Sequence, residues 1–222
     1  DMGGTRLTVG SVQADETVPD HTSPDVLEAA PDVDVPYKPT PARRSAWSQL
    51  RVMVDAGHGG SDEGVSLNGL TEKTLALELA REIANVARSV GGLVALTRDA
   101  DVSMTAPERL GRAEGRRSTV YLAVHFNSSL SPTRSGYRLV VGGSADGSAA
   151  RRLSDALHVG LEAAGFVGEQ DVLPLVTVRG AAMPAAHLEM AYLSSVGEAR
   201  LWLNPTTARR AAEAIWAGLS AY

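Results

Sequence analysis

RVMVDAGHGG, residues 51–60, begins the stretch that decides the fold class. Its first part, residues 51–55, is a short apolar run of the kind that forms a buried strand, and a glycine-rich turn ends it. Residues 72–90 then place leucine, isoleucine and valine side chains at helical spacing. A second apolar run follows Gly91-Gly92 and predicts a strand at residues 93–97. Strands that alternate with helices in this way are typical of parallel sheets.

The same alternation continues to the end of the chain. We expect further strands at residues 119–125, 137–141, 173–178 and 185–190, and helices at residues 105–116, 148–164 and 206–221. The sequence therefore predicts an α/β domain at residues 47–222, with a mainly parallel twisted sheet of about six strands and helices on both faces. The chain has 222 residues, of which 44% are apolar, and this suffices for one well-filled core.

Residues 1–46 differ in composition from the rest of the chain. Residues 1–36 contain eight acidic residues and one basic residue, and six of the eleven prolines lie between Pro19 and Pro41. Proline removes backbone donors and like charges repel each other, so we expect an extended, mobile leader or linker here. A short alternating piece at residues 5–9 is a candidate strand within it.

Composition excludes several classes of function. After residue 36 the chain holds 18 acidic and 20 basic residues, so it lacks the clustered lysine and arginine of a nucleic-acid-binding protein. No apolar run approaches the roughly 18 residues that a membrane-spanning helix needs. There are no cysteines, so any metal ion must be held by histidine, aspartate or glutamate.

Polar residues at the ends of the predicted strands are the candidates for a site, because ligands of open α/β sheets gather at the carboxyl ends of strands. His58 lies in the turn after the first strand, His125 ends the strand at 119–125, and Glu189 lies near the end of a later strand. Glu72 opens the long helix. These two histidines and two glutamates are able to converge on one rim of the sheet, where they are candidates for a metal site. A turn histidine and a first-turn acid favoured by the helix dipole remain the alternative interpretation.

Four segments resemble, in order, the zinc-dependent N-acetylmuramoyl-L-alanine amidases. The opening segment comprises VDAGHGG at residues 54–60, Asp62, Gly64 and GLTEK at 69–73. The other three are LTR at 96–98, VHFN at 124–127 and PAAHLE at 184–189. The resemblance extends from about residue 51 to residue 222. It implies one Zn²⁺ ion held by His58, Glu72 and His125, and it implies that Glu189 is the catalytic base.

The resemblance also implies a reaction. The family hydrolyses peptidoglycan at the amide between the lactyl group of N-acetylmuramic acid and L-alanine of the stem peptide, through a zinc-activated water and a glutamate general base. Such an enzyme works outside the cytoplasm, in the periplasm or cell wall, and we expect a secreted monomer whose regulatory protein, if any, is unidentified. A wall-binding module with impaired catalysis and a zinc peptidase of related architecture are the alternatives.

Departures from the family pattern add two candidate residues near the base. His187 stands where the family usually has an apolar residue, and it shares a strand face with Glu189 two positions later. It is either a partly buried histidine with one hydrogen bond or a contact of Glu189 or the substrate. Asn127 either binds substrate or orders the loop behind His125. We expect Arg98 and Arg109 to be ion-pair or capping residues.

Overall fold

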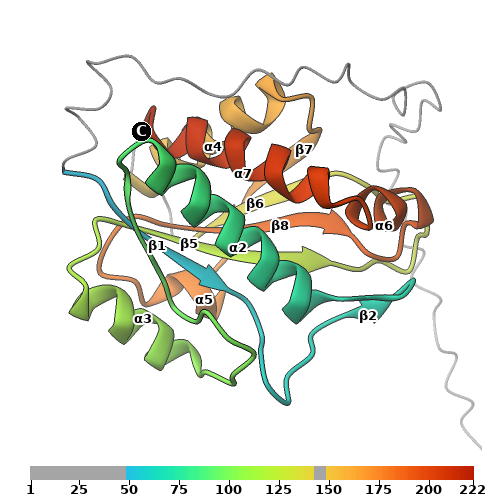
Figure 1. Ribbon diagram of the computed structural model, residues 1–222, viewed down its shortest axis with the longest axis horizontal. Helices are drawn as coiled ribbons and strands as arrows, with labels where there is room; N and C mark the ends of the chain where they lie inside the picture. Colours follow the sequence, from blue (N-terminus) through green and yellow to red (C-terminus); the bar gives the residue numbers. More distant parts are fainter. Residues whose placement is uncertain (1–48, 143–148) are drawn as a thin grey trace, which may run out of the picture. The chain divides into compact units, whose positions relative to one another are not determined.

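The computed structural model describes residues 49–142 and 149–222, so the leader expected at residues 1–46 and its candidate strand at 5–9 lie outside the described residues. Within the described ranges one six-stranded sheet has the order β4-β1-β5-β8-β6-β7 (Figure 1). Its strands are β1 (Arg51–Ala56), β4 (Leu93–Leu96), β5 (Val120–Asn127), β6 (Tyr137–Val141), β7 (Gly168–Val172) and β8 (Ala185–Tyr192).

The sheet is mainly parallel, as predicted. Strands β4, β1, β5 and β8 are parallel neighbours, whereas β6 runs antiparallel to β8 and parallel to β7. A separate hairpin joins β2 (Ser66–Leu67) and β3 (Leu70–Thr71) just before the long helix. The carboxyl ends of the four parallel strands therefore meet at one edge of the domain, which is where a site was expected.

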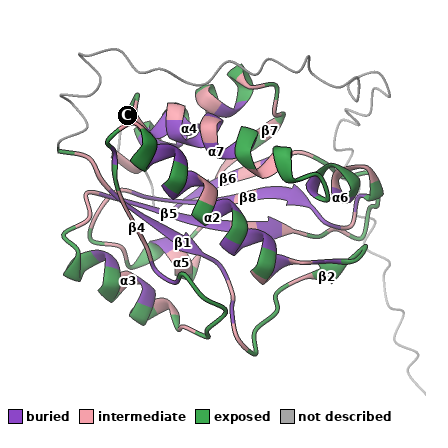
Figure 2. Ribbon diagram, viewed as in Figure 1, coloured by how far each residue is buried: buried purple, intermediate pink, exposed green. Residues whose placement is uncertain are grey.

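Helices cover both faces of the sheet, which confirms the predicted fold class. The helices are α2 (Glu72–Ser89), α3 (Ala106–Gly115), α4 (Ala149–Ala163), α5 (Val176–Arg179), α6 (Val196–Trp202) and α7 (Pro205–Leu219). Figure 1 shows α2, α4 and α7 on one side of the sheet and α3 and α5 on the other. The larger hydrophobic core lies under α2, α4 and α7, and a smaller one lies under α3 and α5. The strands between the two cores are buried (Figure 2).

Strand β5 shows how this layering directs side chains toward the site. Leu122 and Val124 belong to the larger core, while Tyr121 and Ala123 belong to the smaller core beneath α3 and α5. Side chains alternate along a strand, so a strand with helices on both faces is apolar at every position. His125 continues the second set and projects on the α3 and α5 face at the carboxyl end of the strand.

One predicted strand was wrong. Residues 173–178 do not form a strand; β7 ends at Val172 and residues 176–179 form the short helix α5. Pro174 cannot donate a backbone hydrogen bond to a sheet, which explains why pairing stops before it. The true strand, GEQDV, is a polar edge strand with no apolar alternation to reveal it. The other predicted elements agree with the structure to within two residues at each end.

The helix α6 and the contacts that hold it were not predicted from the sequence. Ser195 caps this helix by accepting a hydrogen bond from the backbone N–H of Glu198. The Glu198 carboxylate accepts hydrogen bonds from the backbone N–H groups of Gly136, at 2.7 Å, and Tyr192, at 2.6 Å. Burial raises the pKa of Glu198 to about 7 against these two hydrogen bonds. One glutamate thus ties α6 to the start of β6 and the end of β8.

A buried ion pair anchors the first strand to α3. The Asp55 carboxylate is fully buried and accepts hydrogen bonds from Arg109 at 2.8 Å, Tyr121 at 2.6 Å and Thr97 at 2.5 Å. Arg109 also donates to the backbone carbonyls of Ala56, at 2.6 Å, and His58, at 2.7 Å. The expectation of an ion pair for Arg109 is therefore confirmed. Each charge in this cluster has several partners, which is the condition for a buried ion pair to be tolerated.

We expect Arg109→Met to lower the free energy of unfolding by about 3–5 kcal/mol, because it leaves the buried Asp55 carboxylate without its cation. Arg116→Met is the matched control on the exposed end of the same helix, and it should change stability by less than about 0.5 kcal/mol. Urea unfolding in the presence of a chelator measures both variants without a contribution from metal binding. Equal stability of the two variants would contradict the structural role assigned to Arg109.

Candidate metal centre

The loop that carries His58 is held by glycines and by two buried arginines. His58 has a positive φ of 55°, and Gly59 and Gly60 follow with φ values of 129° and 60°. A Cβ atom at Gly57 would lie 2.3 Å from the ring of His125, so only glycine leaves room for that imidazole. Arg98 donates to the carbonyls of Ala56, at 2.9 Å, and Gly57, at 2.7 Å. This loop therefore presents His58 beside His125.

Glu72 is the residue on which the two histidines converge. It begins α2, is 2% exposed, and places Oε1 at 3.0 Å from both His58 Nε2 and His125 Nδ1. Its two oxygens also accept backbone hydrogen bonds, Oε1 from Phe126 at 3.0 Å and Oε2 from Val65 at 2.9 Å. Burial opposes the charge of Glu72, but the hydrogen bonds with His125 and His58 outweigh it and hold its pKa well below the usual range.

The donor atoms of His58, Glu72 and His125 all lie within 4.8 Å of one another. Two imidazole nitrogens and one carboxylate oxygen form a donor set that suits a divalent ion such as zinc, and three protein ligands leave a position open. Burial lowers the pKa of His125 against the opposing effect of Glu72, which favours the neutral imidazole that a metal requires. Asp62 lies 2.9 Å from Nδ1 of His58, in position to orient that ring.

Glu189 lies beside this cluster on the neighbouring strand. In the sheet register Glu189 of β8 pairs with His125 of β5, and the two side chains share the α3 and α5 face. Its carboxylate is 18% exposed and accepts a hydrogen bond from the side-chain amide of Asn127. Three candidate metal ligands therefore lie next to a carboxylate on the adjacent strand that is partly open to solvent.

Comparisons with known proteins agree with this geometry. The family pattern described as N-acetylmuramoyl-L-alanine amidase matches residues 52–221. The chain belongs to this amidase family. The amidase AmiC of Neisseria meningitidis is 34% identical over 113 residues, which cover 50% of this chain and 27% of the relative. The endolysin of Bacillus phage SPP1 is 30% identical over 157 residues, 68% of this chain and 57% of the relative. The chain thus spans less than two thirds of either relative.

A solved structure supports the same assignment at the level of the fold. The catalytic domain of CwlV, an N-acetylmuramoyl-L-alanine amidase from Bacillus (Paenibacillus) polymyxa var. colistinus, superposes with a TM-score of 0.72 at 27% identity. The match covers 78% of this chain and 97% of that domain. The described part of this chain is therefore an amidase-family catalytic fold.

Within the amidase fold, both further candidates lie beside Glu189. His187 is 6% exposed, its Nδ1 lies 3.0 Å from the hydroxyl of Thr177, and its ring stacks on His125 at 4.4 Å between centroids. Its Nε2 lies 3.7 Å from Glu189 Oε1, so this buried histidine hydrogen-bonds with Thr177 and also approaches Glu189. Asn127 donates to Glu189 and accepts from the backbone N–H of Ser128 at 2.7 Å, so it contacts the loop after β5, while substrate binding by Asn127 stays a prediction.

Two neighbours of the centre were not singled out from the sequence. Asp62 belongs to the opening segment of the family resemblance, but its place beside His58 follows from the turn between them. Arg138 approaches Glu189 to 3.9 Å only because β6 pairs antiparallel with β8, and no sequence pattern announces that pairing. The sequence could have indicated Asp62, because it lies four residues after His58. No sequence pattern indicates Arg138.

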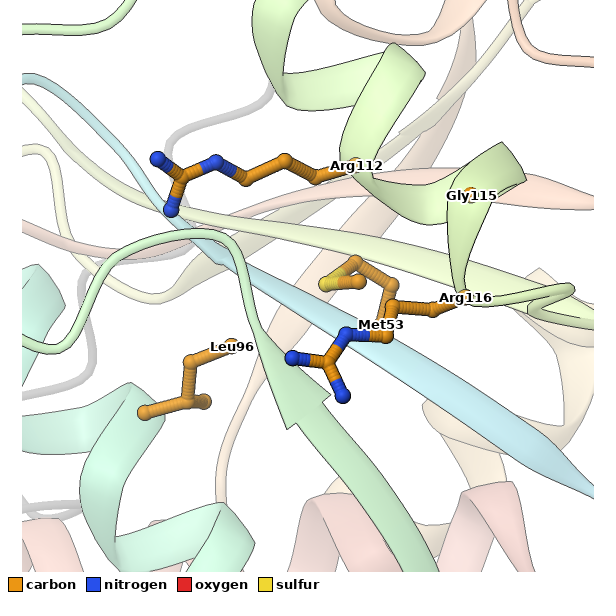
Figure 3. Close-up of a pocket in the computed structure, with 5 residues that line it drawn as sticks. All are labelled: Met53, Leu96, Arg112, Gly115 and Arg116. Carbon is orange, nitrogen blue, oxygen red and sulfur yellow. The ribbon is translucent and has the colours of Figure 1, made fainter.

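A separate cavity of about 290 Å³ lies under α3 and does not include the metal-centre residues (Figure 3). Met53 and Leu96 from the strands line it together with Arg112, Gly115 and Arg116 from α3 and its C-terminal end. Arg112 donates a hydrogen bond of 2.5 Å to the backbone carbonyl of Thr97, which braces the helix against β4. This cavity is therefore distinct from the candidate active site.

Proposed function

We propose that this protein hydrolyses peptidoglycan at the amide between the lactyl group of N-acetylmuramic acid and L-alanine of the stem peptide. The observation that carries the proposal is the convergence of His58 Nε2 and His125 Nδ1 on one oxygen of Glu72, with Glu189 on the adjacent strand. Membership of the N-acetylmuramoyl-L-alanine amidase family supports the choice of substrate and of scissile bond.

His58, Glu72 and His125 fit a single zinc ion, because their nitrogen and oxygen donors are the types that zinc takes and they are already gathered within 4.8 Å. When bound, such an ion lowers the pKa of a coordinated water to roughly 7 and polarises a carbonyl oxygen. Glu72 stays ionised, since its pKa lies below the usual range, and contributes one negative charge among the ligands. A carboxylate ligand reduces the net charge at the centre and so makes a separate base more important.

Glu189 is the base in this proposal. Asn127 donates to Oε2, which holds the carboxylate in one orientation, with Oε1 lying 3.7 Å from Nε2 of His187. Glu189 takes the proton from the attacking water and later gives it to the departing amine of L-alanine. His187 packs between His125 and Thr177 and limits the space in which the carboxylate moves.

Location and partners follow from the substrate. Peptidoglycan lies outside the cytoplasm, so we propose an extracytoplasmic, secreted enzyme that acts as a monomer. Among the described residues, no helix has the length and apolar character needed to cross a membrane.

Digestion of purified sacculi tests the proposal directly. Mass spectrometry should find released stem peptides that begin with free L-alanine, together with intact glycan, and a chelator should abolish their release until zinc is added. Cleavage within the stem peptide instead would indicate a zinc peptidase, and sacculus binding without new amino termini would indicate a wall-binding module. Either result would overturn the proposed reaction.

A further inference from the structure

Arg138 lies in line with the candidate active site, one strand beyond Glu189. In the register of the sheet His125 pairs with Glu189, and Glu189 pairs with Arg138, so the three side chains form a row across β5, β8 and β6 on one face. On this face α5 contacts β5 and β8, whereas α4 packs on β6 and β7 from the other face. The row therefore leads from the candidate metal centre to Arg138 on β6, whose side chain is 24% exposed.

Within the described part of the protein, the guanidinium of Arg138 does not use all of its N–H donors in hydrogen bonds. Its Nη2 donates to Asp171, and Nη1 lies 3.9 Å from Glu189 Oε2. Its Nε is buried, has no hydrogen-bond partner among the described residues and lies 3.7 Å from Glu169 Oε1. Glu169 is instead paired with Arg134, at 2.9 Å. A guanidinium carries five N–H donors in a planar fork that matches a carboxylate. Arg138 is 24% exposed, so part of this fork is accessible to a ligand.

The charge and orientation of Arg138 are set before any ligand binds. Burial opposes its charge, but the hydrogen bond to Asp171 and the nearby carboxylate of Glu189 outweigh this effect and raise its pKa. Asp171 lies on β7 opposite Val140, the second residue after Arg138 along β6, and so holds the guanidinium from one side. A side chain held in this way loses little conformational freedom on binding.

We propose that Arg138 binds a free carboxylate of the stem peptide, on the residue that follows L-alanine, and so makes the enzyme selective for acidic over amidated stem peptides. This inference rests on the proposed amidase function. On the glycan side of the scissile amide the groups are neutral hydroxyls and acetamides, so a cation beside the base fits the peptide side. Neighbouring strands lie about 4.8 Å apart, and an extended peptide advances about 3.3 Å per residue. The separation of one strand between Glu189 and Arg138 therefore suits a group on the residue after alanine.

The test uses the full chain and two disaccharide tripeptides that differ only at the second residue, which carries either a free α-carboxylate or its carboxamide. Wild-type protein should show a kcat/KM at least roughly tenfold higher for the acid, through a lower KM, because a charge-assisted hydrogen bond is lost with the amide. Arg138→Gln should bring the two kcat/KM values together, and Arg138→Lys should keep part of the preference. Arg134→Gln, which removes the same charge from the neighbouring arginine, should retain it.

The outcomes separate this inference from the proposed function. If wild-type protein cleaves neither substrate, the amidase proposal fails. If it cleaves both equally well, or if Arg138→Gln lowers both kcat/KM values by the same factor, the carboxylate site is overturned while the amidase proposal stands. A preference for the acid that survives Arg138→Gln but is lost in Arg134→Gln would overturn the proposal, because it would show that Arg134 binds the carboxylate.

Discussion

Glu189→Gln is expected to lower kcat by about 10²–10⁴-fold, because a general acid–base group in the transition state contributes about that factor. Glutamine has nearly the shape of glutamate and still accepts a hydrogen bond from Asn127, so the side chain should keep its place. It cannot take a proton from water or return one to the leaving amine. Steady-state release of stem peptides measures the loss, and zinc content reports whether the metal centre is intact.

The control for this variant is Glu114→Gln, which removes an exposed carboxylate of α3 that is not among the candidate site residues. Its kcat should match that of wild-type protein. The base assignment to Glu189 would be rejected if Glu189→Gln kept full turnover with one equivalent of bound zinc. Loss of both turnover and zinc would also speak against a purely catalytic role.

Glu72→Gln should abolish zinc binding and, with it, activity. The neutral amide removes the anionic oxygen on which both histidines converge at 3.0 Å. Its NH₂ group also replaces an acceptor, so the backbone N–H of either Val65 or Phe126 loses its partner. We expect zinc affinity to fall by more than the roughly 100-fold typical of losing a residue outside the ligand shell. Stability without metal should fall by about 1–3 kcal/mol.

Metal analysis after dialysis against a weak chelator, together with thermal unfolding, measures both effects of this substitution. Glu63→Gln is the matched control, because Glu63 lies in the loop before α2 and, among the described residues, its carboxylate accepts only from the hydroxyl of Ser66, at 3.3 Å. One equivalent of zinc retained by Glu72→Gln would remove Glu72 from the ligand set and leave the two histidines to be explained separately.

Elements with strong local patterns were predictable, and those without were not. Residues 120–124 are apolar throughout and Leu75, Leu79 and Ile83 repeat at helical spacing, so β5 and α2 were placed correctly from sequence. The strand β7 was missed because an edge strand that pairs on one side tolerates polar residues such as Glu169 and Asp171. The expected strand at 173–178 failed for a related reason, since an apolar run does not by itself distinguish a strand from a buried turn of helix.

The sequence by itself determined the identities of the candidate residues, because His58, Glu72, His125 and Glu189 each lie within a short motif whose residues are adjacent in the chain. It also predicted that three of them follow or end strands. Only the tertiary structure decided that these groups meet. Strand order and register join residues more than fifty positions apart, and no local pattern encodes that pairing. The position of Arg138 beside Glu189 likewise exists only once β6 pairs with β8.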